Sequence, residues 1–256
     1  MEEKVKIMEL NEHELIESIQ SGNISVCVIG IGRIGLPTAL SFANSGLSTV
    51  GIDINSDLVD MINSKIFPLK DEPGYDVIFD KVINKKFYAS TKIQDIVPNS
   101  DVIILSLPTP MDENNIPDYS ALLSVGKQLG ELLTKDSLVI IESTVEPGFI
   151  ENEFIKSIES SEKQLVAGKD FAIGVCPETA NPGQIMNDFE KLPRLVGAID
   201  KKTSNIITKI YKHVFTVDLI PMPNCKTANA VKLTTNVFRD LNIAFVNELA
   251  LIFEKA

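Results

Sequence analysis

The chain has 256 residues, 44% of them hydrophobic, which is enough for one large domain or two small ones. With a formal net charge of −11 it lacks the basic surface that a nucleic-acid partner needs, so we expect none. No apolar run approaches the length of a membrane span, and the three cysteines are too scattered for disulfides or a metal cluster. The composition therefore predicts a cytoplasmic protein with no membrane attachment and no bound metal.

The sequence of residues 1–24 predicts a polar extension that contains one short helix. Asn11 is followed by Glu14 at the spacing of a capping box, and Leu15 and Ile19 give the helix an apolar face. We expect this helix to pack on the surface of the domain that follows.

From Ser25 onward, short runs rich in Val and Ile alternate with longer amphipathic stretches. The expected strands are Ser25–Ile29, Thr49–Ile52, Asp101–Leu107, Ser137–Ile141, Phe171–Val175, Arg194–Ile199 and Val214–Asp218. The expected helices between them include Leu36–Ser45, Asp57–Ser64, Tyr119–Leu133 and Thr203–Lys212. This alternation predicts an α/β domain over residues 25–222, with a doubly wound, mostly parallel sheet.

Residues 223–256 show a different pattern. From Lys226 to Ala256 there is no Pro or Gly, and apolar residues recur at three- and four-residue spacing. This pattern predicts one helix of roughly 30 residues, longer than a compact domain normally contains. Its apolar surface exceeds what its own domain can cover, so we expect it to pack against a second domain or another subunit.

The first expected strand runs directly into the turn Gly30-Ile31-Gly32-Arg33-Ile34-Gly35, and a helix follows. In a dinucleotide-binding turn, the first glycine makes the tight turn and the second lets the pyrophosphate approach the backbone. The third allows close packing of the helix on the strand. The pyrophosphate then lies at a helix N-terminus, where free N–H groups and the helix dipole favour an anion.

The next expected strand ends at Asp53, where a carboxylate can accept hydrogen bonds from the adenosine ribose hydroxyls of a bound dinucleotide. Because a carboxylate repels the 2′-phosphate of NADP, Asp53 favours NAD. An N-cap for the helix at Ser56-Asp57 is a second interpretation of Asp53, compatible with the first. The order of strand, turn, helix, strand and Asp predicts a Rossmann-like domain that binds NAD.

Three further segments follow expected strands and carry polar residues. They are Pro108-Thr109-Pro110, Glu142-Ser143-Thr144 and Cys176-Pro177-Glu178. Because open α/β sheets bind ligands at the carboxyl ends of their strands, these segments together predict a composite cleft. Each one taken singly is explained as well by a capped turn.

On the long helix, Lys232, Asn236 and Arg239 are spaced four and three residues apart, so they share one face. Burial of such a face is costly without an anionic or polar partner. The alternative is a solvated face, and periodicity alone does not reject it.

Together, the glycine turn, the three strand-end segments and the Lys-Asn-Arg helix resemble the UDP-glucose/GDP-mannose dehydrogenase family, and Glu72-Pro73-Gly74 matches a further pattern of that family. Within the family, Cys-Pro-Glu-x-x-x-Pro-Gly at 176–183 and Phe-Arg-Asp-x-Asn-Ile-Ala-Phe-x-Asn-Glu at 238–248 most resemble UDP-N-acetyl-D-mannosamine dehydrogenases. The resemblance runs from Ser25 to Glu254 and covers the N-terminal NAD-binding part and the central helix.

The resemblance implies a four-electron oxidation of the C6 alcohol of a UDP-sugar, through an aldehyde to a carboxylate, with NAD as the hydride acceptor. It implies that UDP-N-acetylmannosamine becomes UDP-N-acetylmannosaminuronate, and that the long helix forms a homodimer interface. The residues it assigns to NAD binding are Gly30, Gly32, Arg33, Ile34, Gly35, Asp53, Thr109 and Thr144. The residues it assigns to the sugar nucleotide are Thr179, Ala180, Lys232, Asn236 and Arg239.

Three residues carry the implied catalysis. Lys232 corresponds to the acid/base and electrostatic helper, and Asn236 to the residue that holds the oxyanion or a water. Glu178 corresponds to a family glutamate of the acyl-enzyme stage. A lysine suits this chemistry, because an ammonium stabilises developing alkoxide charge and burial lowers its pKa for proton exchange.

The chain departs from the resembled pattern at Thr179, where UDP-N-acetylmannosamine dehydrogenases usually carry Arg, and at Asn229, where Glu is common. The family's nucleophilic cysteine lies in a Gly-Gly-x-Cys motif beyond the long helix, and these 256 residues contain neither it nor the following nucleotide-binding domain. We expect Cys27, Cys176 and Cys225 to be structural. The chain alone, as one portion of a longer or split protein, is therefore expected not to complete the reaction.

Three alternatives remain open from the sequence. The oxidised sugar could be that of UDP-glucose or another UDP-N-acetylhexosamine. A β-hydroxyacid dehydrogenase shares the glycine turn and the spacing of Lys232 and Asn236, but does not explain the Cys-Pro-Glu or Phe-Arg-Asp segments. The third alternative is a non-catalytic module for NAD binding and dimerisation.

Overall fold

The computed structural model describes residues 5–255. The first four residues of the expected extension and the last residue of the expected helix lie outside this range. Among the described residues, no helix is long and apolar enough to cross a membrane, and no group of His, Cys, Asp and Glu side chains is arranged to hold a metal ion.

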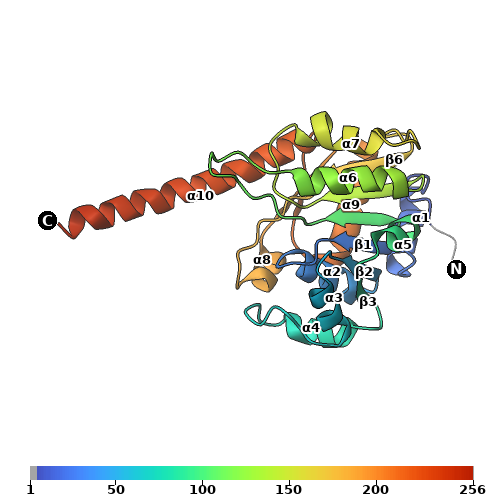
Figure 1. The fold of residues 1–256 in the computed structure, drawn as a ribbon, viewed down its shortest axis with the longest axis horizontal. Helices are drawn as coiled ribbons and strands as arrows, with labels where there is room; N and C mark the ends of the chain where they lie inside the picture. Colours follow the sequence, from blue (N-terminus) through green and yellow to red (C-terminus); the bar gives the residue numbers. More distant parts are fainter. Residues whose placement is uncertain (1–4, 256) are drawn as a thin grey trace.

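One eight-stranded sheet forms the centre of the molecule (Figure 1). Its strands are β1 (Ser25–Ile29), β2 (Ser48–Ile52), β3 (Phe87–Ser90), β4 (Val102–Leu105), β5 (Ser137–Ile141), β6 (Phe171–Val175), β7 (Arg194–Ala198) and β8 (Leu219–Pro221). Their spatial order is β3-β2-β1-β4-β5-β6-β7-β8. The strands from β3 to β6 are parallel, β7 is antiparallel to β6, and β8 is parallel to β7. The predicted doubly wound, mostly parallel sheet is confirmed, and its order reverses between β1 and β4 as in dinucleotide-binding folds.

Helices cover both faces of this sheet. The longer ones are α1 (Glu12–Gln20), α2 (Gly35–Asn44), α3 (Ser56–Asn63), α4 (Tyr75–Val82), α6 (Ser120–Leu132), α9 (Lys201–Val214) and α10 (Cys225–Phe253). The short ones are α5 (Ile93–Ile96), α7 (Ile155–Glu159) and α8 (Ile185–Lys191), with a 3₁₀ turn at Val97–Asn99 and a π-helical turn at Ile150–Phe154. The predicted helices agree with α2, α3, α6 and α9 to within about two residues at each end.

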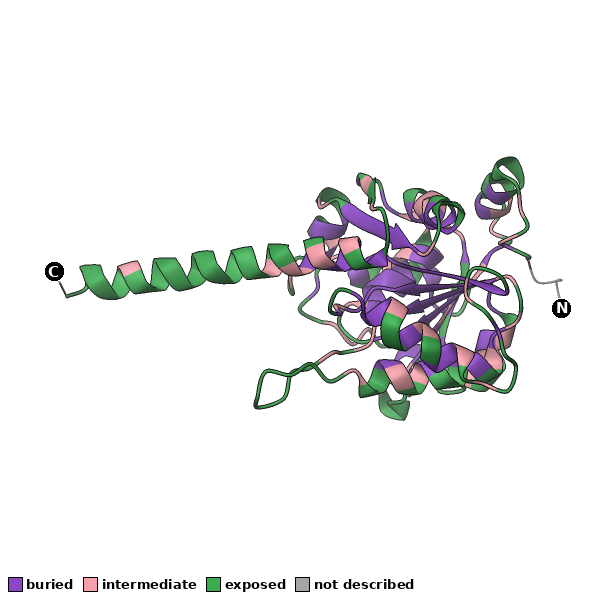
Figure 2. Cartoon of the chain, turned by 90° about the horizontal axis from the view of Figure 1, so that it is seen from above, coloured by how far each residue is buried: buried purple, intermediate pink, exposed green. Residues whose placement is uncertain are grey.

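Alternate residues of each strand feed two separate apolar cores. On β1, Val26 and Val28 pack with the helices α1, α2, α4 and α9, whereas Cys27 and Ile29 pack with α6, α7 and the start of α10. This follows from the two-residue period of side chains along a strand. Helices cover both faces, so the sheet is buried throughout its centre (Figure 2). This burial explains why the strand sequences are continuous Val- and Ile-rich runs.

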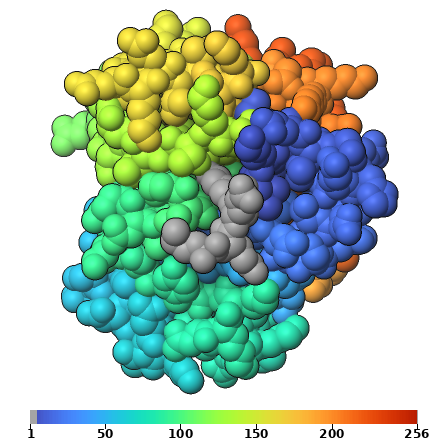
Figure 3. Space-filling model, turned by 90° about the vertical axis from the view of Figure 1, so that its right-hand side faces the viewer, coloured from blue at the N-terminus to red at the C-terminus, as the bar shows by residue number. Residues whose placement is uncertain are grey.

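The N-terminal helix docks as expected. Asn11 accepts from the N–H groups of His13 and Glu14, and the Glu14 side chain accepts from the Asn11 N–H, so the predicted capping box is present. Leu15 and Ile19 are buried. A salt bridge of 2.6 Å joins Glu12 on α1 to Lys209 on α9, and Figure 3 shows the surface of α1 beside that of α9.

Some predicted boundaries are wrong. The segment Val214–Asp218 is not a strand, because α9 continues through Val214 and the strand β8 begins only at Leu219. Val214 continues the apolar stripe of α9, so helical packing overrides its β propensity. The strand expected at Asp101–Leu107 ends at Leu105. The edge strand β3 was not predicted, since it is four residues long and exposes Tyr88.

The predicted long helix is confirmed as α10, which spans 29 residues and extends away from the rest of the molecule (Figure 1). Its buried residues are Cys225, Ala228, Asn229 and Lys232, all in the first turns. Beyond Lys232 the helix exposes large apolar side chains, namely Val237, Phe238, Leu241, Ile243, Phe245, Val246, Leu251, Ile252 and Phe253. Its own domain therefore covers only the first part of α10, as the sequence pattern predicted.

Candidate active site

The three glycines of the turn after β1 meet three different constraints. Gly30 has a φ of +87°, and a Cβ there would lie 2.6 Å from the carbonyl oxygen of Ser106. A Cβ at Gly35 would overlap the Gly30 carbonyl, whereas a Cβ at Gly32 would meet no atom within 4 Å. Gly30 therefore makes the turn against β4, Gly35 packs the helix on the turn, and Gly32 faces open space.

That open space adjoins unused hydrogen-bond donors. In the described part of the chain, the N–H groups of Gly32, Arg33 and Ile34 donate no backbone hydrogen bond. These groups precede α2, whose first turn contains no acidic residue. A phosphate group fits such a place, since the donors and the positive end of the helix dipole both favour an anion.

Asp53 lies beside this turn. Its Oδ2 accepts from the Ile31 N–H at 3.1 Å, and its Oδ1 accepts from the Asn55 N–H at 3.0 Å. The N-cap of α3 is Asn55, whose side chain accepts from the Leu58 N–H. The interpretation of Asp53 as this N-cap is therefore wrong. The half-buried carboxylate fixes the glycine turn, at the position predicted for a ribose contact.

Arg33 is held by two carboxylates. Its Nη1 lies 2.6 Å from Asp71 and 3.0 Å from Glu72, and hydrogen bonding to Asp71 is the main cause that raises its pKa. Glu72 is buried and also accepts from the N–H groups of Gly183, at 2.6 Å, and Ile185, at 3.3 Å. The glycine turn is thus tied to the segment that follows the Cys-Pro-Glu motif.

The predicted strand-end residues meet in space. The Thr109 hydroxyl donates to the carbonyl of Thr144 at 2.8 Å. The Ser143 hydroxyl accepts from the Leu107 N–H at 2.9 Å and donates to the Leu107 carbonyl at 2.8 Å. The loops after β4 and β5 are therefore joined, and the loop after β4 lies next to the glycine turn.

Glu142 lies at the start of the loop after β5 and is fully buried. Its carboxylate accepts from the hydroxyls of Thr38 at 3.0 Å and Tyr211 at 2.8 Å, and it pairs with Arg194 at 3.4 Å. Burial raises the pKa of Glu142, and the charge of Arg194 opposes this shift. The Glu142 carbonyl accepts from the Glu178 N–H at 3.4 Å, so this buried cluster also positions the loop after β6.

The polar face of α10 meets that same loop. Asn236 accepts from Lys232 at 3.3 Å and from Arg239 at 3.1 Å, and Arg239 also donates to the side chain of Asn181. Lys232 is buried, so the interpretation of a fully solvated face is wrong for this residue. Asn181 was not predicted, although it lies within the Cys-Pro-Glu-x-x-x-Pro-Gly motif.

Lys232 is electrostatically coupled to its neighbours. Burial lowers its pKa, the Glu178 carboxylate raises it, and the nearby charge of Arg239 lowers it. The net direction is downward. A lysine in this state exchanges a proton at a pH closer to neutrality than an exposed lysine does.

The two departures from the family pattern lie in the same region. Thr179 and Ala180 are half-buried, and the Ala180 N–H donates to the Glu178 side chain. Asn229 is buried one helical turn before Lys232, and its Nδ2 has no hydrogen-bond partner among the described residues. Neither residue supplies the charge that the resembled pattern has at its position.

All three cysteines are buried and unpaired. Burial raises the pKa of Cys225 and of Cys176 to about 12 in each case, and that of Cys27 is also raised by burial. Burial and then the charge of Glu151 raise the pKa of Cys225, and a backbone hydrogen bond opposes this shift, so the thiol is not activated at the start of α10. These features fit the structural roles predicted for the cysteines.

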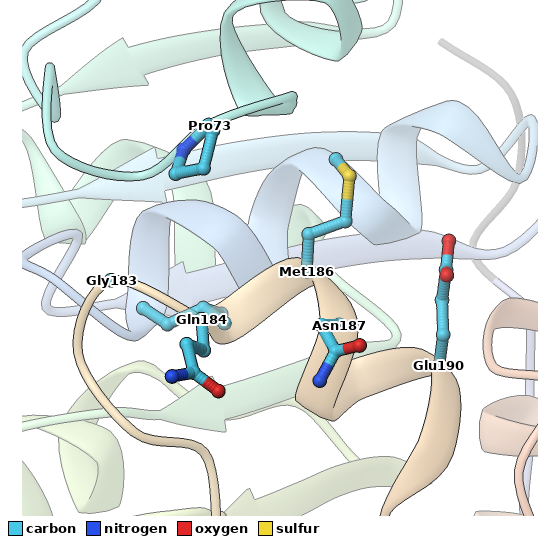
Figure 4. A pocket seen from close by; sticks show the side chains of 7 residues that line it. Pro73, Gly183, Gln184, Met186, Asn187 and Glu190 are labelled. Carbon is cyan, nitrogen blue, oxygen red and sulfur yellow. The ribbon is translucent and has the colours of Figure 1, made fainter.

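An open cavity of about 420 Å³ lies between the Glu72-Pro73-Gly74 segment and α8 (Figure 4). Its lining residues are Pro73, Gly183, Gln184, Ile185, Met186, Asn187 and Glu190. This lining includes no basic side chain, so the cavity offers no cation to a phosphate. None of the predicted site residues lines it.

The sequence profile that describes the NAD binding domain of the UDP-glucose/GDP-mannose dehydrogenase family matches residues 24–215. The chain belongs to this family. The cofactor of its matched domain is accordingly NAD, and the open space at Gly32 with its free N–H donors fits the cofactor's pyrophosphate. Membership of this family also removes the β-hydroxyacid dehydrogenase alternative.

Known relatives of the family match most of this chain. The UDP-N-acetyl-D-mannosamine dehydrogenase of Campylobacter jejuni is 36% identical over 236 residues, which are 90% of this chain and 57% of that protein. Protein CapL of Staphylococcus aureus is 36% identical over 237 residues, which are 91% of this chain and 53% of that protein. The solved structure of the UDP-D-ManNAc dehydrogenase of Pyrococcus horikoshii superposes with a TM-score of 0.84 at 35% identity, covering 90% of this chain and 54% of that one. The chain thus spans about half the length of the curated relatives it matches.

The charge of Lys232 can be followed directly by NMR of the chain with ¹³C-labelled lysine, with the signal assigned by its loss in Lys232→Arg. We expect a titration midpoint below the ordinary lysine value of 10.5. Arg239→Gln should raise the midpoint and Glu178→Gln should lower it further, because each removes one of the charges that acts on Lys232. A midpoint at the ordinary value, unmoved by both substitutions, would contradict the electrostatics described here.

Proposed function

We propose that this chain is the NAD-binding portion of a UDP-sugar 6-dehydrogenase that oxidises UDP-N-acetylmannosamine to UDP-N-acetylmannosaminuronate. The observation that carries the proposal is the cluster of Lys232, Asn236 and Arg239 beside the loop after β6. Arg239 donates to Asn181 of this loop, and the charge of Glu178 acts on the pKa of Lys232. This cluster combines a lysine of lowered pKa, an amide and a guanidinium. The names of the relatives supply the substrate.

The residues of the cofactor side have distinct roles in this proposal. Gly32, Arg33 and Ile34 receive the pyrophosphate, and Asp53 binds the adenosine ribose. Thr109 and Thr144 lie next to the nicotinamide. Bound NAD accepts the hydride that leaves C6 of the sugar.

The residues of the substrate side handle the proton and the charge. The amine of Lys232 takes the proton of the C6 hydroxyl, and the resulting ammonium stabilises the negative charge that develops on that oxygen. Asn236 holds the same oxygen or a water beside it, and Arg239 attracts the charged nucleotide. Glu178 acts at the acyl stage, in which Thr179 and Ala180 contact the substrate. That stage needs a reactive thiol, and the buried cysteines of this chain do not supply one.

A cytoplasmic location is part of the proposal. It is supported by the three free thiols, since a reducing compartment keeps cysteines unpaired.

NAD binding by the chain itself is the first test. Gly32→Ala should raise the dissociation constant for NAD by about tenfold or more, equal to about 1.4 kcal/mol, because the added methyl group occupies the space through which the pyrophosphate approaches. The melting temperature should not change, since this Cβ meets no atom within 4 Å. Calorimetric titration and thermal unfolding measure the two quantities.

Gly35→Ala provides the contrast. Its Cβ would overlap the Gly30 carbonyl, so this substitution should lower the melting temperature as well as the affinity. If the unaltered chain bound no NAD at millimolar concentration, the proposed cofactor role would be refuted.

Catalysis is tested in a full-length protein that carries this segment, by NADH absorbance. Lys232→Ala should lower kcat by about a hundredfold or more, the usual contribution of a general acid or base. Lys226→Ala, which removes an exposed lysine of the same helix, is the matched control and should leave kcat unchanged. Unchanged turnover in Lys232→Ala would refute the catalytic assignment.

The same assay separates the alternatives for the substrate and the class of protein. Turnover should be faster with UDP-N-acetylmannosamine than with UDP-glucose or UDP-N-acetylglucosamine. NAD binding without oxidation of any UDP-sugar would instead favour the non-catalytic module.

We also propose that the exposed part of α10 forms a homodimer. Phe238→Asp and Leu241→Asp should each raise the dimer dissociation constant by about tenfold or more, since a charge would be buried in an apolar contact. Asn247→Asp adds the same charge at a polar position of the same helix and should have little effect. A sedimentation experiment that finds only monomer of the unaltered chain at high concentration would contradict this interface.

A further inference from the structure

Glu72 joins two loops that are far apart in the sequence. Its side chain is 1% exposed. It accepts from Arg33, which is 39 residues away in the glycine turn, and from Gly183, which is 111 residues away. A second oxygen accepts from the N–H of Ile185, the first residue of α8. Figure 4 shows Pro73, the neighbour of Glu72, and Gly183 on opposite sides of the cavity.

The two loops are further restrained on both sides of Glu72 and Gly183. Pro73 follows Glu72 and Pro182 precedes Gly183, and each proline fixes its own φ. Two residues before Gly183, Asn181 is bonded to Asp188 through its backbone N–H at 2.8 Å and its side chain at 2.9 Å. Asn181 also accepts from Arg239. The segment from Glu178 to Ile185 is therefore a short, well-restrained connection to the polar face of α10.

We propose that Glu72 is a positioning residue that couples NAD binding at the glycine turn to the order of the substrate loop at residues 178–185. The inference rests on the proposed function, in which NAD covers the turn at Gly32 and Arg33. The Arg33 side chain is 43% exposed. A cofactor that covers it removes water and strengthens its ion pair with Glu72. Glu72 is then held more firmly on the amides of Gly183 and Ile185, and linkage requires that an ordered loop strengthens NAD binding in return.

Asp71 provides a matched control. It pairs with the same Nη1 of Arg33 at 2.6 Å, but its side chain is 59% exposed. In the described part of the chain, the side chain of Asp71 has no hydrogen bond to the 183–185 segment. Loss of the Asp71 carboxylate should therefore remove one of the two ion pairs of Arg33. It should leave the hydrogen bonds by which Glu72 joins the two loops intact.

The experiment compares amide hydrogen exchange of Gly183 and Ile185 with and without saturating NAD, with saturation established by calorimetry for each variant. In the unaltered chain, NAD should slow exchange at both amides by about fivefold or more, the lower end of ordinary coupling between sites. Glu72→Gln should lose this NAD-dependent slowing, and Asp71→Asn should keep it. A residue with a purely structural role would change the basal exchange rate but not its response to NAD.

Arg33→Met is a second variant, in case Glu72→Gln folds poorly. It removes the ion pair with Arg33 but keeps the Glu72 carboxylate as the acceptor of the Gly183 and Ile185 amides. At saturating NAD it should lose the response of these two amides to NAD. The proposal is overturned if NAD saturates the unaltered chain without slowing these amides, or if Arg33→Met or a folded Glu72→Gln keeps the full response. A failure of the unaltered chain to bind NAD would be seen separately by calorimetry, and it would overturn the proposed function together with this inference.

Discussion

The buried carboxylate of Glu142 is the interaction on which the arrangement of the site depends. It stands at the end of β5 and is held by Thr38 on α2, Tyr211 on α9 and Arg194 on β7. A buried charge is costly unless it is fully paired, so these elements are confined to one relative position. The guanidinium of Arg194 also lies over the rings of Phe189 at 4.3 Å and Phe215 at 4.0 Å, which packs the pair within the core. This cluster therefore fixes the positions of the strand ends that carry Ser143, Thr144 and Glu178.

The helix α10 positions the residues of the proposed substrate side. Its buried residues end at Lys232, so the lysine lies where the helix leaves the domain. One rigid element thereby brings Lys232 to the loop of Glu178 and presents a long apolar surface beyond it. Placing a reactive side chain on a helix rather than on a flexible loop favours a fixed geometry. The site and the proposed dimer interface are therefore consecutive parts of a single helix.

Local sequence patterns were sufficient to predict a feature where its interacting groups are close in the chain. The glycine turn, the capping box of Asn11 and Glu14, and the face shared by Lys232, Asn236 and Arg239 are each read from a few consecutive turns or residues. The alternation of strands with the helices α2, α3, α6 and α9 was predicted for the same reason. The edge strand β3 and the boundary at Val214 were not predicted, because a short half-exposed strand and a helix end carry weak periodic signals.

By itself, the sequence determined the Rossmann-like class, the glycine turn after β1, and the identity of the residues on the polar face of α10. Only the tertiary structure decided that β7 runs antiparallel to β6, that Asn181 meets Arg239, and that Glu72 bonds to both Arg33 and Gly183. The physical reason is that periodicity and turn chemistry act between neighbours in the chain. A hydrogen bond between loops 111 residues apart exists only after the sheet has brought its strand ends together.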